Sequence, residues 1–173
     1  FNSSQDHHMF GDLYEKLLSE LQSAGDAGEF YTPRAVTQFI VDQVNPQLNE
    51  KILDPACGTG GFLVNVIEHL RAKAKTKEDQ RLLQQAFSGI EKKHLPFILC
   101  MTNMLLHGID VPNNVRSKNT LSRPLRDWTQ SEKVDAIVTN PPFGGEEEDG
   151  IENNFPGDLR TRETADLFLI VMI

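Results

Sequence analysis

The sequence predicts an α/β fold in which a mostly parallel sheet carries helices on both faces. Short apolar runs alternate with longer segments of helical periodicity, which is the pattern of strand, helix, strand, helix. A glycine-rich turn joins the first apolar run to the helix after it, and the unusual polar residues follow the ends of such runs. Ligands of these folds bind at the carboxyl ends of the strands, so we expect the functional site at that edge.

The first segment, residues 1–27, is interpreted as the end of a helical region that begins before residue 1. Its leucines come close to a helical stripe, which breaks at "SAGDAGE"; they are Leu13, Leu17, Leu18 and Leu21. The next segment, "TPRAVTQFIVDQV", predicts a helix with Thr32 as its cap and Pro33 at its first position. We expect its buried face to carry Val36, Phe39, Ile40 and Val44.

Four strands and two more helices follow. Residues 51–73 predict a strand, the glycine-rich turn and a helix whose inner side carries Leu63, Val66, Ile67 and Leu70. "AFSGIE" predicts a strand that ends at Glu91, and residues 95–110 predict a helix stopped by Gly108. Further strands are expected near Val115 and at "VDAIV", residues 134–138, while residues 70–85 are expected to form a charged helix end and surface loop.

The last segment, "DLFLIVMI", predicts a helix or a strand that is cut in mid-run. A domain is not expected to end on so many exposed apolar side chains. We therefore expect the domain that starts near residue 28 to be truncated at its C-terminal end, with more chain after residue 173.

Composition excludes several classes of protein. The net charge of −8 argues against a domain that grips nucleic acid unaided, so a nucleic-acid enzyme would need basic surface from another domain or subunit. No apolar run approaches the ~20 residues that span a bilayer, and the start lacks a signal-peptide pattern, which predicts a cytoplasmic protein without membrane contact. The two cysteines, Cys57 and Cys100, lack metal or disulfide spacing. The acidic run "EEEDG" at Glu146 to Gly150 lacks alternating ligand spacing and is expected to be a solvated loop, so no metal site is predicted.

The glycine-rich turn "DPACGTGG", Asp54 to Gly61, is expected to bind a nucleoside. The nicotinamide pattern G-x-G-x-x-G fails because its last position from Gly58 is Leu63, and the Gly-Lys-Ser/Thr of a phosphate-binding loop is missing. A nucleoside without pyrophosphate, such as S-adenosylmethionine, remains. Glu91, at the end of the next strand, is placed to accept hydrogen bonds from ribose hydroxyls, although a solvated strand end would also explain it.

The stretch "NPPFGG", Asn140 to Gly145, follows the fourth apolar run. Its two prolines stop the strand and hold Asn140 and Phe143 in a stiff turn. Taken alone, this stretch is also explained by ordinary turn chemistry.

Five motifs in order resolve that ambiguity: "GEFYTP", "DPACGTGGF", "GIEKK", "NTL" and "NPPFGG". From Gly28 onward, the chain resembles amino-methylating DNA methyltransferases of the gamma arrangement, and in particular the modification (M) subunit of type I restriction-modification systems. The resemblance implies a Rossmann-like, S-adenosylmethionine-dependent methyltransferase fold, with residues 28–173 as the N-terminal part of the catalytic domain. It also implies a specificity subunit, a second M subunit and a restriction subunit as partners, with duplex DNA as the substrate.

The resemblance also assigns residues to the cofactor. Those that would close over its methionine end are Glu29, Phe30, Tyr31, Thr32 and Pro33. Those that would line its backbone side are Asp54, Gly58, Thr59, Gly60 and Gly61. Glu91 would bind the ribose, and Asn119 stands where many relatives have an aspartate that touches the cofactor's adenine.

The catalytic turn would consist of Asn140, Pro141, Pro142 and Phe143. The 6-amino group of adenine is a poor nucleophile because its lone pair is delocalised into the ring. The side-chain oxygen of Asn140 and the carbonyl of Pro141 could hold its two hydrogens and turn the lone pair toward the methyl group. The adenine must leave the duplex to reach such a pocket, where Phe143 would stack on it.

Two alternatives remain open from sequence. "NPPF" also occurs in methyltransferases that modify a glutamine amide in protein or a guanine amine in RNA. A non-catalytic scaffold that holds a specificity subunit would retain the fold but lose cofactor binding.

Overall fold

The computed structural model describes Tyr14, Lys16 and residues 32–173. Its sheet consists of four parallel strands in the order β3-β2-β1-β4, namely β1 (Ile52–Asp54), β2 (Phe87–Glu91), β3 (Val115–Ser117) and β4 (Ala136–Ile137). Ile52 of β1 pairs with Phe87 on one side and with Ala136 on the other. The predicted parallel α/β fold is confirmed, and the strand order reverses between β1 and β4, where such folds bind ligands.

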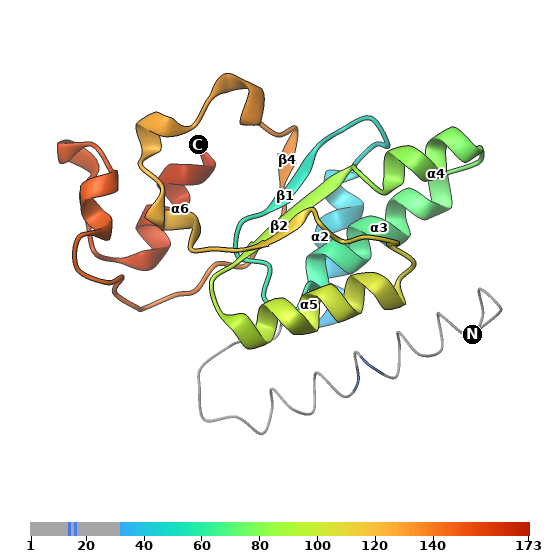
Figure 1. Ribbon diagram of the computed structural model, residues 1–173, viewed down its shortest axis with the longest axis horizontal. Coiled ribbons are helices and arrows are strands. Elements are labelled where there is room, and N and C mark those ends of the chain that lie inside the picture. The colour runs from blue at the N-terminus through green and yellow to red at the C-terminus, as the bar shows by residue number, and fades with distance from the viewer. Residues whose placement is uncertain (1–13, 15, 17–31) are drawn as a thin grey trace.

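Five α-helices accompany the sheet in the described residues from 32 onward: α2 (Arg34–Val44), α3 (Gly61–Lys73), α4 (Lys77–Leu83), α5 (His94–Leu106) and α6 (Thr164–Met172). The connections through α3 and α5 step in the same direction along the sheet, so right-handed crossovers place both helices on one face. The connection from β3 to β4 steps the opposite way and crosses the other face. Figure 1 shows α2, α3 and α5 below the sheet and the turns of residues 120–132 above it.

Two apolar clusters hold these layers together. The larger one packs the helices against the sheet, and the predicted inner side of α3 is fully buried in it, as expected for Leu63, Val66, Ile67 and Leu70. The smaller cluster joins the short 3₁₀ turn η1 (Thr120–Ser122) to α6 through Leu121, Phe155, Leu167 and Phe168. It fixes α6 beside the carboxyl ends of the strands.

The start and the face of α2 differ from the prediction. The helix begins at Arg34, after Pro33, and no side chain caps it, so the prediction of Thr32 as cap and Pro33 as first helical residue was wrong. Of the predicted face, only Ile40 packs against the core, whereas Val36, Phe39 and Val44 are exposed. The buried residues of α2 are Thr37 and Val41. Thr37 can be buried because its hydroxyl donates to the carbonyl of Arg34 and accepts from Asn65.

Two further segments form helices. Residues 77–83, expected within a surface loop, form α4 because Thr76 and Asp79 make a reciprocal capping box at its start. The final apolar run forms α6. Tyr14 and Lys16 are helical, but the rest of the proposed helical region 1–27 lies outside the described residues. Within the described part of the chain, no helix is both long and apolar enough to span a bilayer.

Candidate active site

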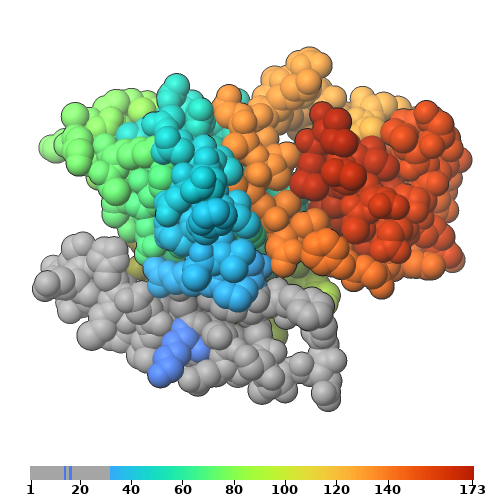
Figure 2. Space-filling model, turned by 180° about the vertical axis from the view of Figure 1, so that it is seen from behind, coloured from blue at the N-terminus to red at the C-terminus, as the bar shows by residue number. Residues whose placement is uncertain are grey.

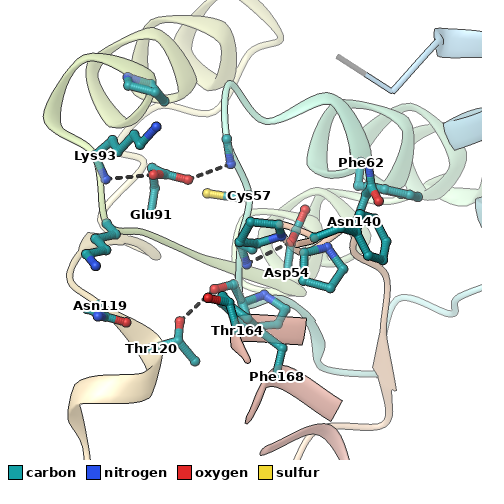
Figure 3. Close-up of a pocket in the computed structure, with 18 of the residues that line it drawn as sticks. Asp54, Cys57, Phe62, Glu91, Lys93, Asn119, Thr120, Asn140, Thr164 and Phe168 are labelled. Carbon is teal, nitrogen blue, oxygen red and sulfur yellow. Dashed lines mark hydrogen bonds between the residues drawn. The ribbon is translucent and has the colours of Figure 1, made fainter. Parts of the chain in front are cut away.

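The carboxyl ends of β1, β2 and β4, together with the start of α6, border a cavity of about 580 Å³. That volume falls within the range of small-molecule sites. Most of the predicted site residues line it: Thr32, Asp54, Gly58, Thr59, Gly61, Glu91, Asn119, Asn140, Pro141, Pro142 and Phe143. Gly60 and Pro33 do not line it, and Glu29, Phe30 and Tyr31 lie outside the described residues. Figure 3 shows the labelled side chains around this space.

The glycines of the turn serve two different purposes. A Cβ on Gly58 or Gly61 would meet no atom within 4 Å and would extend into open space beside the cavity. A Cβ on Gly60 would lie 2.8 Å from Sγ of Cys100 on α5, and Gly60 has a left-handed φ of 90°. Gly58 and Gly61 therefore leave room for a ligand, whereas Gly60 permits the close approach of α5.

The carboxylate of Glu91 is held by two backbone donors. Its Oε2 accepts from the N–H of Gly58 at 2.9 Å, and its Oε1 accepts from the N–H of Lys93 at 2.7 Å. An ionised carboxylate has about four acceptor positions, so each oxygen can take another donor. Glu91 is thus fixed in place with capacity left for a diol such as that of ribose.

Asp54, at the end of β1, is a buried carboxyl group. Only 1% of the residue is exposed, and burial raises the pKa of its carboxyl group from about 3.8 to about 7. The N–H of Ala56 donates to Oδ1 at 3.1 Å and favours the charged form, but does not offset the burial. A cationic group of a ligand would lower this pKa by stabilising the carboxylate.

The amide of Asn140 is oriented by a residue far away in sequence. Its Nδ2 donates to Oγ1 of Thr32 at 3.0 Å, which turns Oδ1 to the other side of the amide. Within the described residues, no donor contacts that Oδ1. Three positions further along, Phe143 is 67% exposed beside the same cavity. The turn therefore presents an open acceptor and an open aromatic face.

Cys57 lines the cavity but is not suited to act as a nucleophile. Its Sγ lies 3.9 Å from Sγ of Cys100, and both thiols are buried. The contact with Cys100, and then burial, raise the pKa of Cys57 well above its usual range. A thiol held in its neutral form is a packing group.

Several residues that line the cavity were not predicted from sequence, including Phe62, Lys92, Thr120, Glu147, Thr164 and Phe168. Phe62 and Thr120 directly follow predicted site residues, which is a usable signal. Glu147 was expected in a solvated loop, yet its side chain is only 10% exposed. It accepts a hydrogen bond from Nδ2 of Asn119 at 3.1 Å, so the solvated-loop prediction was wrong for this carboxylate.

The comparisons with known proteins agree with one another. The family model described as N-6 DNA Methylase matches residues 5–173. The chain is 62% identical over its whole length to the type I restriction enzyme EcoEI methylase subunit of Escherichia coli, of which it covers 35%. It is 33% identical over 78% of its length to the EcoKI methylase subunit of E. coli K12, covering 27% of that protein.

The comparison with solved structures agrees with the comparison of sequences. A modification subunit from Vibrio vulnificus YJ016 superimposes with a TM-score of 0.90 at 52% identity, over 99% of this chain and 36% of that one. The EcoKI M protein gives a TM-score of 0.71 at 26% identity, over 86% of this chain and 32% of that one. The chain thus spans about a third of the length of these proteins.

Proposed function

Because the chain belongs to the N-6 DNA methylase family, we propose that it is part of a type I modification subunit that methylates the 6-amino group of adenine in DNA. The observation that carries this proposal is the Thr32–Asn140 hydrogen bond, which leaves the amide oxygen of Asn140 open to a donor. S-adenosylmethionine, the methyl donor we propose, would supply an electrophilic methyl group on a sulfonium centre.

The residues of the cavity fit such a cofactor. Gly58 and Gly61 leave space that a side chain would fill, and the carboxylate of Glu91 is fixed with acceptor positions to spare for the ribose. Thr59 completes the turn, and Asn119, which follows β3, lines the cavity where the cofactor's adenine is expected. The segment from Glu29 to Pro33 remains assigned to the methionine end by resemblance.

At the catalytic turn, Asn140 orients and polarises the target amine. Its Oδ1 and the carbonyl of Pro141 accept the two amino hydrogens, and the two prolines keep these acceptors preorganised. An amide does not titrate near neutral pH, so Asn140 is not a strong base. Phe143 stacks on an adenine that has left the duplex, which gives its exposed ring a function.

DNA binding and targeting are proposed to depend on partners. A net charge of −8 leaves little capacity for phosphate contacts on this chain alone. One of the similar structures belongs to work on complex assembly of the type I R-M system. We propose that a specificity subunit, a second M subunit and a restriction subunit assemble with the full-length protein in the cytoplasm.

Two alanine variants of the full-length protein separate the proposed roles. Asn140→Ala should lower methyl transfer at least about a hundredfold while cofactor affinity stays within about twofold, since its partner is the adenine amine. Glu91→Ala should weaken cofactor binding first. Asn113→Ala replaces an exposed asparagine and is the control for Asn140→Ala in the measurements of methyl transfer and of cofactor affinity. Loss of cofactor binding by folded Asn140→Ala would overturn the assignment.

A further inference from the structure

We infer that Glu147 is a specificity-determining residue that accepts a hydrogen bond from the 6-amino group of the cofactor's adenine. This inference rests on the proposed function, because it names a contact within the same cofactor site. Glu147 comes from the acidic run after the catalytic turn, far along the chain from the glycine-rich turn and Glu91.

The carboxylate of Glu147 is held firmly by one of its two oxygens. Oε2 accepts from Nζ of Lys92 at 3.1 Å and from Nδ2 of Asn119 at 3.1 Å. The backbone N–H of Glu147 donates to the carbonyl of Arg162 at 3.0 Å, which fixes the main chain as well. Two contacts therefore hold the carboxylate and a third holds the main chain of the same residue.

The other oxygen, Oε1, has no donor among the described residues. The side chain is nine-tenths buried, and Glu147 lines the cavity. A carboxylate oxygen that is left open at the wall of a cavity can accept a hydrogen bond from a ligand that brings a donor to it.

The assignments of the neighbouring residues indicate which hydrogen-bond donor of the cofactor reaches Oε1 of Glu147. The ribose hydroxyls are assigned to Glu91, and the methionine end is expected near Thr32 and Asn140. The 6-amino group of the adenine is the donor that remains. Oδ1 of Asn119 already accepts from the N–H of Leu121 at 2.9 Å, and its Nδ2 donates to Glu147, so Oε1 of Glu147 is the more open acceptor of the two.

The pair is also consistent in charge. An aspartate at position 119 would place a second carboxylate about 3 Å from Glu147, which would repel it. An amide at 119 with a carboxylate at 147 leaves one negative charge on this pair of residues, and Lys92 lies 3.1 Å from it.

The test compares two ligands on the full-length protein by calorimetry: S-adenosylhomocysteine and its hypoxanthine counterpart, which carries a keto oxygen in place of the amino group. The wild type should prefer the adenine ligand by about tenfold to a hundredfold, the range expected for one charged hydrogen bond. Glu147→Gln should reduce that preference to a few-fold, since a glutamine amide can turn its N–H₂ to the keto group. Glu148→Gln is the matched control, because Glu148 also contacts Lys92 but its side chain is 76% exposed. It should keep the wild-type preference.

A charge-swapped double variant, Asn119→Asp with Glu147→Gln, should restore most of the preference. If Glu147→Gln keeps the full preference for the adenine ligand, the inference is wrong but the proposed function is unaffected. The same holds if the wild type binds both ligands equally. Tighter binding by Glu147→Gln would overturn it as well, because the acidic loop would then be blocking the cavity. A wild type that binds neither ligand would contradict the proposed cofactor, and with it the proposed function.

Discussion

At the scale of single residues, the Thr32–Asn140 hydrogen bond is expected to affect transfer by orienting the amide of Asn140. Thr32→Val removes the acceptor and frees the amide to rotate, so kcat should fall about tenfold, by the value of one hydrogen bond. Thr32→Ser retains the hydroxyl and should recover most of that loss, which a merely steric role would not explain. The measurement is single-turnover transfer together with the cofactor Kd; equal activity of the valine and serine variants would contradict the role.

The buried carboxyl group of Asp54 should leave a signature in the pH dependence of stability. Its pKa is about 7 in the folded protein and about 4 when unfolded, so between these values the folded state holds the extra proton. Stability from this group is therefore highest below pH 4, declines as pH rises to 7 and is level above. Thermal unfolding of Asp54→Asn and wild type, without ligand, should show the variant gaining relative stability across pH 4 to 7. A constant difference in Tm would contradict the raised pKa.

At the scale of elements, the glycine-rich turn sets how closely α5 approaches the start of α3. Gly60→Ala forces a side chain into a left-handed conformation, which costs about 1–2 kcal/mol, and overpacks Cys100, which costs about 1–3 kcal/mol. Gly61→Ala is the matched control, because its Cβ meets open space and its position opens a helix. Urea unfolding should show a clear loss of stability for Gly60→Ala only. Similar midpoints for both variants would contradict the packing role.

Elements were predictable from sequence where local pattern and burial agree. The inner side of α3 is such a case, since its apolar residues meet the sheet directly. On α2 the apolar pattern predicted the wrong buried face. Thr37 is buried there because its hydroxyl both donates and accepts a hydrogen bond, whereas Phe39 is exposed. The surface helix α4 was missed because its short cap motif lies in a charged segment where periodicity is weak.

At the scale of the whole molecule, the site joins segments that are distant in sequence. Thr32 and Asn140 are 108 positions apart, yet their side chains are hydrogen-bonded beside the same cavity. Figure 2, which views the molecule from behind, shows α2 in blue and the C-terminal segments in orange and red on the same face. The glycine-rich turn, Glu91 and the turn from Asn140 to Phe143 were predictable as motifs, and all three line the cavity. Glu147 was not, since nothing in a run of acidic residues tells which carboxylate the fold will bury.

The proposed division of work between subunits should appear in the salt dependence of DNA binding. The full-length protein alone should bind duplex DNA weakly, because this acidic portion adds few phosphate contacts. Addition of the specificity subunit should tighten binding and steepen the dependence on salt concentration. Fluorescence anisotropy at several salt concentrations measures both; tight, salt-sensitive binding by the M subunit alone would contradict this division.

The central claim is that this site methylates the 6-amino group of adenine in DNA. The most direct measurement is transfer from methyl-labelled S-adenosylmethionine to unmethylated DNA by the full-length protein, with and without its specificity subunit, followed by nucleoside analysis. We predict label in 6-methyladenine when the specificity subunit is present, and none from Asn140→Ala. Cofactor binding without any labelled DNA, or label in a protein or RNA substrate instead, would contradict the account.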